Sequence, residues 1–169
     1  IVGTRRATSY GKEAAFKIAE TLAREGITIV SGLALGIDSA AHEGALAGGG
    51  KTWAVLGSGL QNIWPRVNLP LAERVLAKGG ALISEYPPET KAEYFTFPQR
   101  NRIVAGLAKL VIVVEAPGKS GALITARLAL EAGREVAVVP GDISRPNFLG
   151  SNRLLREGAH PIAEPSDAL

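Results

Sequence analysis

Short apolar runs alternate along the chain with longer amphipathic stretches. Such runs of Val, Ile and Leu, bounded by turn residues, predict strands. Five strands are predicted at Ile27–Ser31, Thr52–Leu56, Gly80–Ser84, Leu110–Val114 and Glu135–Val139, and Ile1-Val2 reads as the end of an earlier strand. Because the runs are continuously apolar, we expect both faces of the sheet to be covered.

Amphipathic stretches follow these strands and predict six helices. Their ranges are Tyr10–Glu25, Ile37–Ala47, Asn68–Lys78, Pro98–Ala108, Ser120–Ala132 and Asn147–Glu157. Glycine is favoured just past the end of a helix, and four glycines stand at such positions: Gly26, Gly79, Gly133 and Gly158. The alternation predicts an α/β fold of the Rossmann-like, doubly wound type, a mainly parallel sheet with helices on both faces.

The organisation of the chain favours one domain. The sequence contains neither an internal repeat nor a low-complexity linker, so we expect residues 1–169 to form a single Rossmann-like domain. The first residues read as the tail of a buried strand, and the chain has no Met. We therefore expect it to be a segment of a longer protein.

Composition excludes several classes of function. The chain has no Cys, which excludes disulfides, zinc–thiolate sites and thiol nucleophiles within it. No apolar run is long enough to span a membrane and no leader precedes the first turn, so we expect a soluble, cytosolic protein. The net charge of +3 is compatible with an anionic partner but does not require one.

The turns that follow the predicted strands are rich in glycine. In a doubly wound sheet these turns meet at the carboxyl ends of the strands, where ligands bind. Glycine before a helix lets the backbone approach a ligand, and the free N–H groups at the helix start favour an anion. Neither G-x-G-x-x-G nor G-x-x-x-x-G-K-[ST] occurs in the expected place, so a nicotinamide site and a Walker P-loop are not supported. We predict an anion site whose candidate loop residues are Gly3, Ser31, Gly32, Gly57, Gly59, Ser120 and Gly121.

Basic side chains occur in the same turns. The guanidinium of arginine presents a planar fork that matches phosphate oxygens. Because successive residues of a helix point in different directions, the run from Gln99 to Arg102 cannot all face one ligand. Each arginine has the alternative of an ion pair with Glu85, Glu89, Glu93 or Glu115. The candidates for phosphate binding are Arg5, Arg6, Arg66, Arg100, Arg102 and Lys119.

Catalytic candidates are few. His42 follows Asp38 by four residues on a predicted helix, where a structural hydrogen bond or cap is the favoured interpretation. Ser31 and Ser120 adjoin glycines but neither lies in G-x-S-x-G, and they read better as helix caps or hydroxyl donors to phosphate. We expect no catalytic residue, no metal and no cofactor.

Several motifs together resemble the DNA-processing protein A (DprA, or Smf) family. They occur in the order usual for that family and cover nearly the whole chain: residues 2–5 (VGTR), 31–42 (SGLALGIDSAAH), 57–59 (GSG), 64–68 (WPRVN), 97–107 (FPQRNRIVAGL), 115–116 (EA), 120–126 (SGALITA) and 140–141 (PG). Each motif alone is ordinary, and the specificity lies in their order and spacing. Trp64 stands where the family often has Tyr, and core packing is the favoured role for its ring over stacking on a base.

The resemblance implies a non-enzymatic domain that binds single-stranded DNA, with little sequence preference. It implies protection of incoming strands during natural transformation, help in loading the recombinase RecA, and homodimerisation. By matching motif, Arg5 and Arg66 would contact phosphate, with Arg100 and Arg102 as further candidates. Loop donors would be Ser31, Gly32, Ser120 and Gly121. Asn68, in the motif of Arg66, and Asn101, between Arg100 and Arg102, are further candidates for DNA binding. The family's N-terminal helical module and C-terminal winged-helix-like module are absent from this segment.

Two other functions stay open. The first is an enzyme of the phosphoribohydrolase (lysine decarboxylase-like) type, whose fold is similar but whose Pro-Gly-Gly-x-Gly-Thr loop this chain lacks. Residues 115–121 resemble that loop only loosely. The second is a sensor of a small nucleotide, or a purely structural domain, built on the same anion-binding turns.

Overall fold

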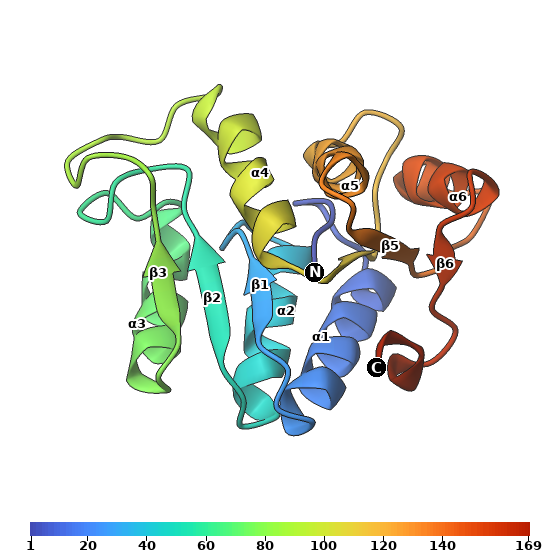
Figure 1. The fold of residues 1–169 in the computed structure, drawn as a ribbon, viewed down its shortest axis with the longest axis horizontal. Coiled ribbons are helices and arrows are strands. Elements are labelled where there is room, and N and C mark those ends of the chain that lie inside the picture. The colour runs from blue at the N-terminus through green and yellow to red at the C-terminus, as the bar shows by residue number, and fades with distance from the viewer.

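The computed structural model describes residues 1–169 and contains two three-stranded parallel sheets. Residues 1–2 connect the two sheets, because Ile1 N donates a hydrogen bond to Val30 O at 2.9 Å and Val2 forms a parallel bridge with Val113. From left to right, Figure 1 shows β3, β2 and β1, then the N-terminus, then β5 and β6. The strands are β1 (Ile29–Ser31), β2 (Thr52–Val55), β3 (Ala81–Ile83), β4 (Leu110–Val113), β5 (Glu135–Val138) and β6 (His160–Pro161).

Six α-helices and three short 3₁₀ helices connect the strands. The α-helices are α1 (Ser9–Arg24), α2 (Ile37–Ala47), α3 (Leu69–Ala77), α4 (Thr96–Leu107), α5 (Gly121–Glu131) and α6 (Leu149–Arg156). The 3₁₀ helices are η1 (Arg66–Asn68), η2 (Pro146–Phe148) and η3 (Pro165–Ala168). None of the helices combines the length and apolarity needed to cross a bilayer.

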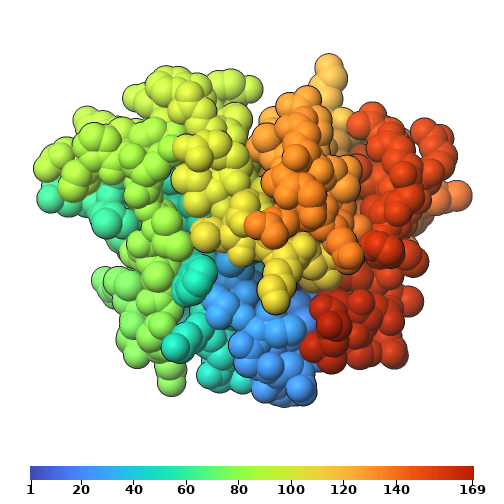
Figure 2. Space-filling model, in the orientation of Figure 1, coloured from blue at the N-terminus to red at the C-terminus, as the bar shows by residue number.

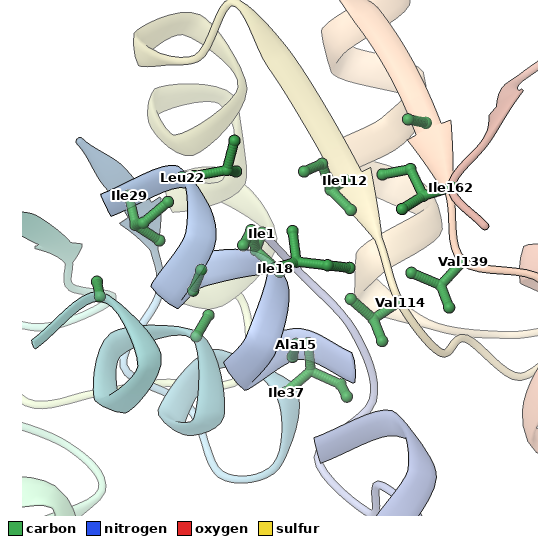
Figure 3. Close-up of a cluster of buried hydrophobic side chains, with 14 of the residues drawn as sticks. Ile1, Ala15, Ile18, Leu22, Ile29, Ile37, Ile112, Val114, Val139 and Ile162 are labelled. Carbon is green, nitrogen blue, oxygen red and sulfur yellow. The ribbon is translucent and has the colours of Figure 1, made fainter. Parts of the chain in front are cut away.

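The core consists of layers on the two faces of the sheet. Successive strand residues point to opposite faces, and β4 follows this rule: Ile112 packs with α1 and α2, whereas Val111 and Val113 pack with α4 and α5. Figure 3 shows the first of these layers, with Ile18 of α1 close to Ile112. A third cluster lies between β2 and α3. Helices α1 to α3 therefore cover one face, and α4 to α6 cover the other.

The predicted doubly wound α/β fold is confirmed. All five predicted strands and all six predicted helices are present, with ends that differ by a few residues, and the four glycines expected to end helices have positive φ angles. Strand β6 was not predicted, because His160–Pro161 is too short to carry a pattern and proline is unusual in strands. That residues 1–169 fold as one domain of a longer protein stays a prediction.

A fully buried carboxylate joins three elements of the fold. Glu115 follows β4, and its oxygens accept hydrogen bonds from Thr8 Oγ1 at 2.8 Å, from Thr8 N, and from Asn147 Nδ2 at 2.6 Å. Thr8 in turn caps α1 by accepting from Gly11 N. Because a buried charge is stable only when it is hydrogen-bonded, Glu115 fixes where α1 begins relative to β4 and η2.

Gly11→Ala should destabilise the protein. A Cβ at Gly11 would lie 2.1 Å from Glu115 Oε2, so the carboxylate must move away from its donors. We expect a loss of about 1–3 kcal/mol in the free energy of unfolding, measured by urea denaturation. The control is Gly106→Ala in α4, where an added Cβ would meet no other part of the protein within 4 Å beyond its own helix backbone. It should be neutral or stabilising by up to about 1 kcal/mol; equal effects of the two substitutions would contradict this role of Glu115.

Candidate functional site

A cavity of about 470 Å³ opens at the carboxyl ends of the strands. It lies between residues 3–6, which follow the first strand segment, and the starts of α4 and α5. Figure 2 shows a notch at the top of the molecule between the yellow residues of α4 and the orange residues of α5. From the central segment at residues 1–2 the chain continues to β1 on one side, whereas β4 lies on the other side. This is the switch point at which doubly wound folds bind ligands.

The cavity wall is strongly basic. Eight predicted residues line it: Gly3, Arg5, Arg6, Arg100, Asn101, Lys119, Ser120 and Gly121. Arg5, Arg6 and Lys119 are exposed and take part in none of the chain's salt bridges. Asp38 is the one acidic residue in the lining. Like charges around a concave surface raise the local concentration of anions, so this cavity favours an anionic ligand.

The start of α5 adds backbone donors to the cavity. Ser120 caps this helix by accepting from Ala122 N at 3.3 Å, which confirms one of its two predicted roles. Ser120, Gly121 and Ala122 all line the cavity. Ala122 N and Leu123 N donate to Ser120, which leaves Gly121 N and the positive end of the helix dipole at the cavity.

Arg100 contributes to the cavity from a buried position. Its Nη1 donates to Gly32 O at 2.8 Å and to Val55 O, the carbonyls that follow β1 and end β2. Its Nε donates to Asn101 Oδ1, and Nη2 has no partner within the protein. Burial lowers the pKa of Arg100, and Asp38 acts in the opposite direction. Arg100 thus holds two strand ends in place and keeps one amino group for a ligand.

Two aromatic rings complete the wall and were not among the predicted site residues. Phe97 lies beneath Arg5, whose guanidinium carbon is 4.8 Å from the ring centroid, a cation–π contact. Tyr94 lines the cavity with 93% of its surface exposed. The signal in the sequence was the aromatic run Tyr94-Phe95-Thr96-Phe97 just before the arginines of α4. Exposed rings beside basic side chains are a common arrangement for stacking nucleic-acid bases.

Seven predicted site residues lie outside the cavity lining: Ser31, Gly32, Gly57, Gly59, Arg66, Asn68 and Arg102. Three of them have polar groups that are used within the fold. Ser31 Oγ donates to Ile1 O at 2.7 Å, Asn68 Nδ2 donates to Leu33 O at 2.8 Å, and Arg102 pairs with Glu85. The proposed alternative of an ion pair therefore holds for Arg102, whereas Glu115 pairs with no arginine.

The three glycines outside the lining allow close packing beneath the site. A Cβ at Gly32 would lie 2.4 Å from Arg100 Nη1, and one at Gly57 would lie 2.8 Å from Phe97 Cδ1. A Cβ at Gly59 would lie 2.0 Å from Pro87 O. Gly32 and Gly57 therefore make room for two residues that do line the cavity.

Arg66 occupies a separate, shallow pocket of about 230 Å³. Trp64 and Lys91 also line this pocket. Neither Arg66 nor Lys91 belongs to a salt bridge. The expectation that Trp64 packs in the core is wrong, because 52% of its surface is exposed. The turn after β2 carries the indole outward, a position that an apolar residue type alone does not reveal.

His42 is fully buried and holds the turn after β1. Its Nε2 accepts from Leu33 N at 3.3 Å, and its Nδ1 lies 2.6 Å from Thr52 Oγ1, which donates to Ile29 O. The ring is therefore neutral with its proton on Nδ1, and the predicted structural hydrogen bond is confirmed. Leu33 has a φ of +58°, which is unfavourable for leucine and is stabilised by this contact. No three His, Cys, Asp or Glu residues are grouped as a metal site would require.

Comparison with known proteins gives one consistent result. The family model described as DNA recombination-mediator protein A matches residues 1–169. Protein Smf of Escherichia coli is 48% identical over 169 residues, which are 100% of this chain and 45% of that protein. The chain spans about half the length of the curated relatives it matches.

Two solved structures are similar over nearly the whole chain. DNA processing protein A of Streptococcus pneumoniae superposes with a TM-score of 0.91 at 43% identity, covering 99% of this chain and 58% of that one. The protein from Helicobacter pylori, whose structure concerns its mode of binding single-stranded DNA, gives 0.89 at 34% identity, with 99% of this chain and 75% of that chain covered.

The buried imidazole of His42 should make stability depend on pH. Burial lowers its pKa from 6.5 to about 3, so below pH 6.5 the unfolded chain takes up a proton that the folded protein does not. Stability is therefore lost as the pH falls, by about 2 kcal/mol between about pH 7 and pH 5 from this group. His42→Gln keeps an acceptor for Leu33 N but does not titrate. Urea denaturation at both pH values should show a smaller loss for His42→Gln; equal losses would exclude His42 as the source.

Proposed function

The chain belongs to the DNA recombination-mediator protein A family, and we propose that it binds single-stranded DNA by its phosphates in the cavity at the strand ends. The observation that carries the proposal is the cavity wall itself. Three cations that belong to no salt bridge, Arg5, Arg6 and Lys119, line it together with the N-terminus of α5, where Gly121 N has no partner in the protein. Phosphates are the anions that such a combination of arginine forks and helix N-termini fits best.

The aromatic residues support a single strand as the ligand. Tyr94 offers an exposed ring on which a base can stack, and stacking needs bases that are not already stacked in a duplex. A concave cavity also admits a flexible chain of phosphates more easily than a stiff double helix. Because phosphate contacts and stacking do not depend on base identity, sequence preference should be slight.

We propose that the biological role follows that of the relatives. Proteins from Bacillus subtilis and Streptococcus pneumoniae that resemble this chain are named DNA processing proteins. On this basis the protein would protect single strands in the cytoplasm during natural transformation and help to load RecA, and it would act as a homodimer. These roles belong to whole proteins. The chain corresponds to only a little more than half the length of these two relatives.

We also propose that the domain acts by binding and not by catalysis. Two buried carboxylates, Asp38 and Glu115, lie near the strand ends, and each accepts from backbone N–H. Glu115 also accepts from Thr8 Oγ1 and Asn147, and it does not line the cavity. Neither is paired with a second acid or a histidine in the arrangement that hydrolysis requires.

Arg5→Ala should weaken binding of oligo-dT and flatten its salt dependence. Removing one phosphate contact lowers the slope of log K against log salt by about 1 and the affinity at low salt by about tenfold. Fluorescence anisotropy across a salt titration measures both. Arg127→Ala removes the same charge from an exposed pair with Glu131, away from the cavity, and is the control.

The two variants have different expected slopes. An unchanged slope for Arg5→Ala would remove Arg5 from the site, and a slope that falls equally in Arg127→Ala would indicate only a long-range charge effect. Arg66→Ala should weaken binding less than Arg5→Ala, because Arg66 lies in the shallow Trp64 pocket outside the cavity.

Incubation with AMP tests the absence of catalysis. We expect no free adenine above the buffer blank, because the cavity lacks a placed acid–base pair for cleavage of the glycosidic bond. Liquid chromatography of the mixture measures the product. Adenine released in proportion to protein concentration, and lost in Asp38→Asn, would favour the phosphoribohydrolase alternative.

A further inference from the structure

One feature of the cavity does not serve phosphate binding. Asp38, the second residue of α2, lines the cavity and is only 6% exposed. Its Oδ2 accepts from Gly32 N at 3.1 Å and from Ala34 N at 3.4 Å. Its Oδ1 has no hydrogen-bond partner within the protein, and Asp38 is in none of the salt bridges. Oδ1 is not among the fully enclosed atoms, so it faces the cavity.

The carboxylate oxygen that faces the cavity receives no hydrogen bond from the protein. Burial raises the pKa of Asp38, whereas the nearby Arg100 and the two backbone N–H groups lower it and favour the ionised form. The position in the first turn of α2 favours the charge further. A hydrogen bond to a charged group contributes more than one between neutral groups. A ligand that brings a donor to Oδ1 therefore gains an interaction that the free protein lacks.

Few parts of a DNA strand can supply that donor. A phosphate is repelled by Asp38 and is drawn instead to Arg5, Arg6 and Lys119 on the cavity wall. A deoxyribose within a strand carries no hydroxyl group. The remaining donors are the N–H groups of the bases.

Each of the four bases carries an N–H donor on its Watson–Crick edge. These are the amino groups of adenine and cytosine, the ring N–H of thymine, and both kinds in guanine. In a duplex this edge faces the partner base, so it cannot enter a cavity. In a single strand the edge is free, as it is when a base is flipped out and read by a protein.

We propose that Asp38 Oδ1 accepts a hydrogen bond from the Watson–Crick edge of one unpaired base, and that this contact makes the cavity select single strands. The inference rests on the proposed function and adds a specificity-determining residue to it. The phosphate of one nucleotide would lie at the basic wall, and the edge of a base would lie at Asp38. Because every base has such a donor, the contact favours unpaired bases without choosing among them.

The test compares two strands that differ only in the donor. Short homopolymers of deoxyadenosine and deoxynebularine have purine rings of the same size, but nebularine lacks the amino group. We expect the wild type to bind the deoxynebularine strand at least about tenfold more weakly at fixed salt. In Asp38→Ala, which has no side-chain acceptor, the ratio of the two affinities should fall to about one.

Arg5→Ala is the matched control. It should lower the affinity for both strands equally and leave their ratio unchanged, since it removes a phosphate contact. Thermal denaturation checks that each variant is folded. The wild-type ratio can overturn the inference without any variant.

Each outcome has a defined meaning. Equal binding of the two strands by the wild type, with Arg5→Ala still weakening both, would overturn the role of Asp38 and leave the proposed function standing. A ratio that persists in folded Asp38→Ala would overturn it too, as would tighter binding of deoxynebularine, which would make Asp38 a donor. Failure of the wild type to bind either strand would instead overturn the proposed function.

Discussion

The turn after β1 is the constraint on which the site depends. Gly32 lies between two buried opposite charges: its N–H donates to Asp38 and its carbonyl accepts from Arg100. Leu33, in a left-handed conformation, is held on both sides as well, with its N–H bonded to His42 and its carbonyl to Asn68. The polar groups of this turn are buried and must be paired, and the partners come from α2, α4 and η1. One turn thus fixes three elements at the carboxyl ends of the strands.

This arrangement explains why many polar side chains near the cavity form hydrogen bonds within the fold. Arg100, Asn68 and His42 are held by backbone groups, and Gly32 and Gly57 leave the space that Arg100 and Phe97 fill. Besides Nη2 of Arg100, the cations available to a ligand come from the edges of the scaffold: Arg5, Arg6 and Lys119. A site whose supporting side chains are locked by packing and hydrogen bonds is preorganised, so little ordering is left for the moment of binding.

The sequence predicted the fold well because the fold follows from periodicity. Buried parallel strands read as apolar runs, and β4 shows the pattern on both faces. The site was predicted only in part, because the sequence does not distinguish an arginine that is paired within the fold from one that is free to bind phosphate. Arg102 and Arg5 both belong to basic motifs, yet one is paired with Glu85 and the other lies over Phe97. Trp64 was misplaced for a related reason, since a large apolar residue in a turn can point inward or outward.

Asp38 shows how support and recognition can be combined in one side chain. Its Oδ2 belongs to the scaffold, because it pairs N–H groups of the β1 turn, whereas its Oδ1 belongs to the cavity. A residue used only for support would have both oxygens paired, as Glu115 has. A side chain with one oxygen held by the scaffold and the other open to the cavity is oriented before a ligand binds. Within a basic cavity, this oriented acceptor can contribute to binding only when the ligand brings a hydrogen-bond donor.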